Sequence, residues 1–209
     1  MDGRTQESAV APDSSPPPPA SPEERDGRRL RSAESRARIV QAMLALIQEG
    51  DVSPSAEQVA DRAGVGLRTV FRHFKDMDSL YSEMSEVIER EVRAISEQPF
   101  KSAEPRGRVL ELVARRGEAF EKIAPFKRAS EALRHRSQFL DADSNRLVVA
   151  LRAILEHIAP PEVVADRERL ETLDLLLSWE SWARLRREQG LSPVQARKVL
   201  ESAVGRVLD

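Results

Sequence analysis

The 209-residue sequence contains no cysteine, which excludes disulfide bonds, thiolate zinc sites and thiol nucleophiles. No apolar run is long enough to span a bilayer, and no basic segment followed by an apolar core opens the chain as a secretion signal would. We therefore expect a cytoplasmic protein that makes no contact with a membrane.

Patterns typical of catalysis and metal binding are also missing. The three histidines, His73, His135 and His157, lie in separate segments, and none has a second ligand at metal-binding spacing. The sequence has neither a glycine-rich phosphate loop nor a nucleophile elbow. We expect no catalytic residues, no metal and no cofactor, and hence a protein that is not an enzyme.

The residues that are present predict a helical protein. Hydrophobic residues make up 40% of the chain and charged residues 33%, as is typical of a soluble globular protein. Apolar residues recur at helical spacing along most of the chain, whereas no β-strand pattern or internal repeat is found. The sequence therefore predicts an all-α fold of about nine helices.

The N-terminal part differs in composition from the rest. Residues 1–27 are rich in proline, serine and acidic residues and have almost nothing to bury, so we predict a disordered tail. A basic arm of Arg28, Arg29 and Arg31 follows. A first amphipathic helix is predicted from Ser32 to near Gly50, with an apolar face of Ile39, Met43, Leu46 and Ile47.

Positive charge is concentrated in one block of the chain. The net charge is −2, yet residues 26–75 carry nine basic against six acidic residues. Such a block suits a polyanionic partner, although arginine also makes good solvated helix surface. Charge alone leaves both interpretations open.

Two short helices are predicted within this block. Ser55 and Gln58 have the spacing of a capping box, which predicts a helix of about eight residues. Gly64 suits the turn that follows, because glycine adopts left-handed backbone conformations. A further helix from about Gly66 to Phe74 would bury Val70 and Phe74, which are four residues apart.

The other side of that helix would present polar groups. Arg68 and Arg72 form one neighbouring pair on it, and Thr69 and His73 form another. A short helix with two guanidiniums, a hydroxyl and an imidazole is suited to the major groove of DNA, where arginine donates twice to guanine. Thr69, Lys75 and His73 suit phosphates.

These features resemble a known family. Ser55-Ala-Glu-Gln-Val-Ala, Ala63-Gly-Val-Gly, Arg68-Thr-Val-Phe-Arg-His-Phe and Asp76 to Leu80 are similar to the DNA-binding head of the tetracycline-repressor (TetR) family of bacterial transcriptional regulators. The likeness covers residues 37–81. It implies DNA contacts by Ser55, Leu67, Arg68, Thr69, Arg72 and His73. The predicted DNA-binding residues also include Phe71 and Lys75.

Two residues depart from the family pattern. Phe71 stands where the family usually has tyrosine, and Met77 stands where it usually has lysine. Both changes remove a group that would contact a phosphate. Both residues are compatible with the same packing.

The remaining residues predict a helical body. Asp76 can cap a long helix from about Met77 to Gln98. Further helices are predicted from Pro105 to Pro125, from Phe126 to Arg136, from Ser144 to Ile158, from Pro161 to about Gln189, and from Pro193 after the cap Ser192.

The last two helices are the predicted surface for self-association. Their apolar stripes can form a four-helix bundle across a two-fold axis, although part of each stripe must pack on its own chain. The resemblance favours a homodimer that binds a palindromic operator in double-stranded DNA. The predicted interface residues are Leu173, Leu176, Leu177, Trp182, Val199, Leu200 and Ala203.

An effector pocket is expected in the body, for a small apolar molecule that releases the protein from DNA. Its candidate lining residues are Met84, Phe120, Phe126, Phe139 and Trp179, although each also suits plain core. The predicted organisation is a tail (1–27), a helix-turn-helix head (28–76) and an effector-binding and dimerisation body (77–209). Two alternatives stay open: a DNA-binding regulator or architectural protein without a ligand, and a helical interaction protein with a degenerate head.

Overall fold

The computed structural model describes residues 22–209, so most of the predicted tail lies outside the described residues. Ten α-helices and one π-helical segment form this part of the chain, with no strand among them, which confirms the all-α prediction. None of these helices is both long and apolar enough to cross a membrane. The chain divides into two units, with the boundary between Glu34 and Ser35.

The first helix is longer than predicted. α1 runs from Pro22 to Gln48, so it begins ten residues before Ser32 and includes the basic arm. Proline suits the first turn of a helix, and the arginines and Leu30 that follow are good helix formers. Apolar residues of α1 become buried only from Ile39 onward.

The next three helices follow the local signals in the sequence. α2 (Ala56–Ala63) has the predicted capping box, and Gly64 ends it with a left-handed backbone at φ 64°. α3 (Leu67–His73) follows after a three-residue turn. α4 (Met77–Ser96) begins at Asp76, whose carboxylate accepts a hydrogen bond from the Ser79 amide at 2.9 Å.

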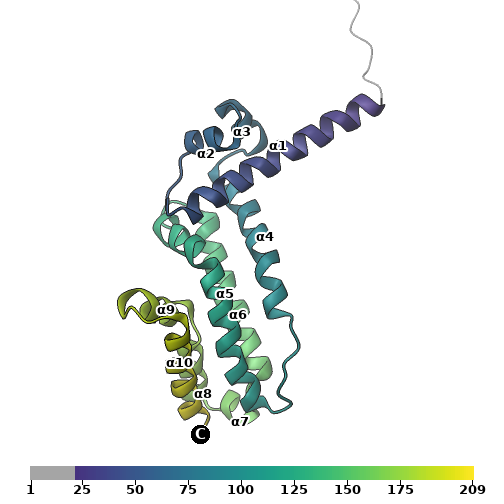
Figure 1. Cartoon of the computed structure of the whole chain (residues 1–209). Helices are drawn as coiled ribbons and strands as arrows, with labels where there is room; N and C mark the ends of the chain where they lie inside the picture. The colour runs from purple at the N-terminus through teal and green to yellow at the C-terminus, as the bar shows by residue number, and fades with distance from the viewer. Residues whose placement is uncertain (1–21) are drawn as a thin grey trace, which may run out of the picture. The chain divides into compact units, whose positions relative to one another are not determined.

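Two long helices complete the central bundle of the unit from Ser35 to Asp209. α5 (Pro105–Leu133) and α6 (Gln138–Ile158) run side by side with α4 (Figure 1). The predicted break at Pro125 is wrong, because α5 continues through it. Proline inside a helix costs about 3 kcal/mol, but buried residues on both sides, Ile123 and Phe126, hold α5 in place.

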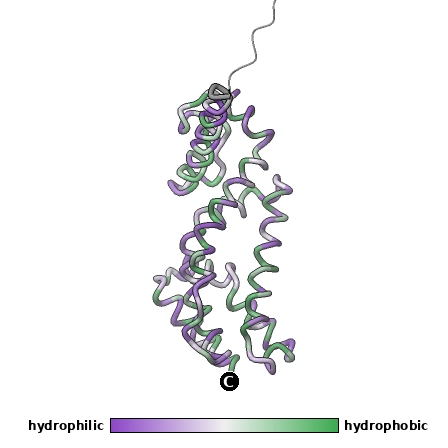
Figure 2. Tube along the Cα trace, turned by 90° about the vertical axis from the view of Figure 1, so that its right-hand side faces the viewer, coloured by the Kyte–Doolittle hydropathy of each residue, from purple (hydrophilic) through white to green (hydrophobic). Residues whose placement is uncertain are grey.

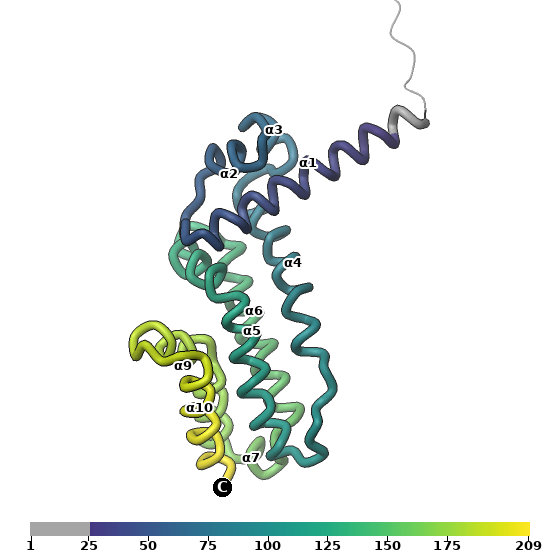
Figure 3. The backbone as a smooth tube through the Cα atoms, viewed as in Figure 1, coloured from purple at the N-terminus to yellow at the C-terminus, as the bar shows by residue number. Residues whose placement is uncertain are grey.

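The C-terminal part is more divided than predicted. In place of one helix to Gln189 there are α7 (Pro161–Ala165), α8 (Arg167–Leu176), α9 (Trp179–Ala183) and the π-helical segment η1 (Arg184–Glu188). Asp166 and Ser178 each cap a new helix with their side chains, which explains the breaks. α10 (Pro193–Leu208) then returns alongside α8 and packs on α5, as the chain path in Figure 3 shows.

Apolar and polar residues alternate along these helices as amphipathic packing requires, which the colours of Figure 2 make visible. The buried residues form two clusters. The head core joins α1, α2, α3 and α4 to the C-terminal half of α5, and the body core joins the N-terminal half of α5 to α6, α8, α9 and α10. Pro125 lies between Ile123 of the body core and Phe126 of the head core.

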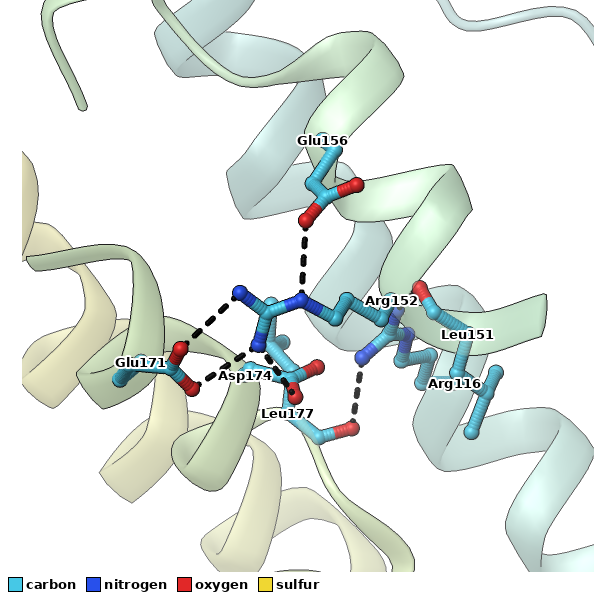
Figure 4. A network of polar contacts seen from close by, with 7 residues as sticks. All are labelled: Arg116, Leu151, Arg152, Glu156, Glu171, Asp174 and Leu177. Atoms are coloured by element: carbon cyan, nitrogen blue, oxygen red, sulfur yellow. Dashed lines mark hydrogen bonds and ion pairs between the residues drawn. The ribbon is translucent and has the colours of Figure 1, made fainter. Parts of the chain in front are cut away.

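A polar network ties three helices of the body together (Figure 4). Arg116 of α5 is buried and donates to the carbonyl oxygens of Leu151 on α6 and of Leu177 after α8. Burial lowers the pKa of Arg116 to about 10, although the nearby charge of Asp174 opposes this shift. Among the residues that the structure describes, no carboxylate accepts a hydrogen bond from the Arg116 guanidinium.

Arg152 forms the outer part of the same network. Its guanidinium donates to both carboxylate oxygens of Glu171 at 2.9 and 3.0 Å, and to Glu156 at 2.9 Å (Figure 4). These hydrogen bonds raise the pKa of Arg152. Because Glu171 lies on α8 and Arg152 on α6, the pair joins the two helices.

Candidate functional site

The exposed side of α3 is the candidate DNA-binding surface. Arg68 and Arg72 are exposed on it, one turn apart, and Lys75 is exposed just beyond its end. Phe71 is 49% exposed on the same helix although it is aromatic. Val70 and Phe74, which are four residues apart, are both buried in the head core, as their spacing in the sequence predicted. The opposite side of α3 is therefore exposed.

Three other predicted DNA-contact residues also lie near this surface. Leu67 is exposed at the start of α3, and Thr69 is half-buried. Ser55 is exposed at the start of α2, where its hydroxyl accepts a hydrogen bond from the Gln58 amide at 3.2 Å. The Ser55 hydroxyl proton remains able to donate to a phosphate.

His73 lies differently from the other predicted contacts. It is half-buried, and its Nε2 atom is covered without a hydrogen-bond partner among the described residues. Burial lowers the pKa of His73, and the positive charges of Arg72 and Arg36 lower it further. A neutral, partly covered imidazole is a poor phosphate ligand, so the exposed arginines carry most of the chemistry of this surface.

Arg36 fixes the position of α3, and the sequence analysis did not single it out. Its guanidinium donates to the His73 carbonyl oxygen and to Glu83 of α4, each at 2.5 Å. It also lies over the ring of Phe74, 4.4 Å from the ring centroid. Its spacing of three residues before Ile39 places it at the border of the apolar face, which is the signal that could have identified it.

Met77 is half-buried and packs against the head core. A methionine can pack in this way at a position where the family that the sequence resembles usually has a lysine. Because Met77 carries no charge, the start of α4 offers no cation to a DNA phosphate from this position.

A cleft of about 580 Å³ lies between α4, α5 and α6. Met84 and Phe126, two of the predicted pocket residues, line it. Further apolar residues line its walls: Ile88, Val92, Ile123, Leu140, Leu147 and Ala150. The cleft therefore has the size and the mostly apolar walls of a small-molecule site.

Polar groups in the cleft are joined to one another. Asp143 pairs with Arg146 at 2.7 Å and accepts from the Ser85 hydroxyl at 3.3 Å. Lys127 donates to the Ser144 hydroxyl at 3.3 Å. The Lys127 ammonium has three donors, so it can also bind a ligand without releasing Ser144.

The other three predicted pocket residues lie elsewhere. Phe120 and Trp179 pack edge to face in the body core, with ring centroids 5.8 Å apart. Phe139 packs against the head core beneath the Arg146 guanidinium, 5.5 Å from it. Aromatic side chains mark core and pocket alike, so the sequence could not separate the two.

The predicted dimerisation residues divide into two groups. Leu173, Leu177, Trp182 and Leu200 are buried within their own chain. Val199 is 46% exposed, and Leu176 and Ala203 are half-buried. Leu175, which the sequence analysis left out, is 64% exposed on α8.

No protein-family model matches the sequence, and no curated protein is significantly similar to it. Solved structures share its fold. One is a proposed transcriptional regulator from Streptomyces coelicolor A3(2), with a TM-score of 0.59 and 23% identity over 84% of this chain and 98% of that one. Another, a transcriptional regulator from Rhodococcus sp. Rha1, has a TM-score of 0.58 and 17% identity over 85% of this chain and 95% of that one.

A third structure is a proposed TetR-family transcriptional regulator from Mesorhizobium loti MAFF303099. Its TM-score is 0.53, with 20% identity over 85% of this chain and 96% of that one. At such identities the likeness establishes a common fold. The chain thus has an all-helical fold that occurs in proteins described as transcriptional regulators.

Proposed function

We propose that this chain is a dimeric, sequence-specific DNA-binding transcriptional regulator of the TetR family, and not an enzyme. The observation that carries the proposal is the exposed pair Arg68 and Arg72 on α3, a helix that Arg36 holds from behind. Because α3 is seven residues long and buries only Val70, most of its surface is free to enter a major groove.

In the proposed complex, Arg68 and Arg72 read base edges in the major groove. A guanidinium donates twice to the O6 and N7 atoms of guanine, which distinguishes that base from the other three. Ser55, Thr69 and Lys75 contact phosphates and set the position of the helix. In a dimer, the two helix-turn-helix heads bind the two half-sites of a palindromic operator.

The regulatory part of the proposal is a repressor that a small molecule releases from DNA. The cleft between α4, α5 and α6 supports it, because α4 connects the head to the body and also lines the cleft. A ligand that separates α4 from α5 and α6 would move the head. A thermal-shift screen against small apolar compounds tests for such a ligand, since binding raises the melting temperature.

The polar pairs inside the cleft favour a second candidate function. Because Asp143 and Lys127 already have partners within the chain, the cleft can be stable without a ligand. The protein would then be a DNA-binding regulator or architectural protein of the same fold that has no effector. A screen without a stabilising compound, together with operator binding, would favour this candidate.

Selection of bound fragments from genomic DNA provides the operator needed to test DNA recognition. Arg68→Ala and Arg72→Ala should each weaken binding to that operator by about 1 to 3 kcal/mol and relax its sequence preference. Arg184→Ala, at an exposed position in η1, is the control and should bind as the wild type does. Wild-type affinity in both α3 variants would refute the assignment of α3 as the recognition helix.

A further inference from the structure

The net positive charge of residues 26–75 lies in α1 and not in the part that includes α2 and α3. From residue 39 to residue 75, which includes α2 and α3, four basic and four acidic residues balance. From residue 26 to residue 38 there are five arginines against two acidic residues. The whole positive excess of residues 26–75 therefore belongs to residues 26–38 of α1.

The side chains of residues 26–34 of α1 are not buried in a core. Arg28, Arg29 and Arg31 are exposed, and Leu30 between them is 65% exposed. A surface helix that stabilises a core normally buries an apolar stripe. None of residues 26–38 is buried, and Arg28, Arg29 and Arg31 are exposed, so these three arginines are available to a partner in solution.

The covalent connection keeps this segment close to the recognition helix. Arg31 and Arg36 are five residues apart, and five residues span at most about 18 Å even when fully extended. Arg36 in turn donates to the carbonyl oxygen of His73 at the end of α3. Whatever the arrangement of the two units, the Cα atom of Arg31 therefore lies no farther than about 18 Å from that of Arg36.

The exposed side of α3 has few groups that can bind phosphates. Leu67 and Phe71 occupy exposed positions on it but have no side-chain donor for a phosphate. The balanced charge of residues 39–75 gives little long-range attraction to DNA. Neutralisation of phosphates supplies most of the non-specific affinity of DNA-binding proteins.

We propose that Arg28, Arg29 and Arg31 form a second DNA contact, in which they bind backbone phosphates of the duplex next to the base pairs that α3 reads. This inference rests on the proposed DNA-binding function. The arm supplies affinity that is independent of sequence, whereas Arg68 and Arg72 supply discrimination. The two roles can be separated experimentally because phosphate contacts change the salt dependence and base contacts change the sequence preference.

The test uses the full chain and a labelled random-sequence duplex of about 40 base pairs, long enough for a dimer that spans half-sites one or two turns apart. Binding is measured over a series of salt concentrations for the wild type and for Arg28→Gln/Arg29→Gln/Arg31→Gln. The slope of log affinity against log salt should fall by about 0.9 for each phosphate that the variant no longer neutralises. Affinity for the selected operator should fall by the same factor as affinity for the random duplex.

Two matched variants control for charge and for helix structure. Lys101→Gln/Lys122→Gln/Arg184→Gln removes three exposed charges from the body and should leave the slope unchanged. Arg28→Lys/Arg29→Lys/Arg31→Lys keeps the charges and should keep most of the slope. The thermal melting curve of every variant should match that of the wild type, because none of these side chains packs in a core.

The result that overturns the proposal is a wild-type slope in the glutamine variant while Arg68→Ala no longer discriminates between operator and random DNA. That outcome would leave the proposed DNA-binding function standing but refute the phosphate contact by Arg28, Arg29 and Arg31. If the wild-type protein showed no salt-dependent binding to either duplex, both the function and the phosphate contact would be refuted. Weaker binding to phosphatidylserine vesicles in the glutamine variant, with an unchanged DNA slope, would assign the arm to an anionic membrane surface and also overturn the proposal.

Discussion

The indole of Trp182 lies directly against the backbone of Gly117: a Cβ atom at Gly117 would lie 2.7 Å from Cη2 of Trp182. The indole cannot easily move away, because its Nε1 donates to Glu121 at 2.8 Å and the residue is buried. Gly117 therefore sets how closely α9 packs on α5.

Gly117→Ala should lower the free energy of unfolding by about 1 to 3 kcal/mol, because overpacking displaces a buried side chain. Denaturant unfolding measures this change. Gly205→Ala is the matched control: it lies inside α10 with nothing within 4 Å of the added Cβ, and it should leave stability unchanged or raise it by up to about 1 kcal/mol. Equal effects of the two substitutions would argue against the close contact at Trp182.

Gly64 and Gly66 allow a test of the turn between α2 and α3. Neither glycine has an atom within 4 Å of an added Cβ, but only Gly64 has a positive φ, at 64°. Gly64→Ala should cost about 1 to 2 kcal/mol, because alanine is strained in the left-handed region. Gly66→Ala should cost less, since φ −72° and ψ 148° are ordinary for any residue. Thermal unfolding of the two variants in parallel measures the difference. A larger loss of stability in Gly66→Ala than in Gly64→Ala would contradict the prediction.

His73 should make the stability of the head depend on pH. Its pKa is lowered in the folded chain, mainly by burial, so the unfolded chain binds more protons as the pH falls through about 6.5. Stability therefore rises with pH in that window; the contribution is present above about pH 6.5 and is lost as the pH falls toward the folded pKa.

The measurement is the free energy of unfolding between about pH 7.5 and about pH 5. The decrease in stability toward acid pH should be smaller in His73→Gln than in the wild type. His135→Gln, at an exposed position, controls for the change of residue type. A pH profile that His73→Gln leaves unchanged would show that this imidazole is not the titrating group.

Arg152 of α6 donates two hydrogen bonds to Glu171 of α8. We therefore expect the two residues to be energetically coupled. A double-mutant cycle of Arg152→Ala and Glu171→Ala should give a stabilising interaction energy that decreases with added salt, because the bidentate pair is partly exposed. The Arg184 and Glu188 pair, a single contact of 3.3 Å between two exposed side chains, should show weaker coupling. No coupling at Arg152 in low salt would mean that the network does not tie the helices in solution.

Exposed Leu175 is the sharpest test of the proposed dimer. Leu175→Glu should give a folded monomer, because this side chain is exposed in the chain alone and would be covered only by a partner. Light scattering at micromolar concentration reports the mass, and circular dichroism reports the helices. Val149→Glu, equally exposed but on α6, should remain dimeric. A dimeric Leu175→Glu variant would place the interface elsewhere.

Local signals in the sequence are enough to predict the helix-turn-helix. Its signals connect residues only a few positions apart: Ser55 with Gln58, Gly64 with its own backbone, and Asp76 with Ser79. Local hydrogen bonds and backbone sterics decide such features, so composition and spacing are enough to predict them. The exposed position of Arg68 and Arg72 follows from the same short-range periodicity.

Long-range packing determines which apolar residues of the body face the core, the cleft or solvent. Leu173 and Leu175 lie on the same helix, yet one is fully buried and the other is mostly exposed. Pro125 remains inside a helix, and Arg116 is buried, because residues far away in sequence surround them. These outcomes depend on packing between distant segments, and a one-dimensional pattern does not contain the identity of the neighbours.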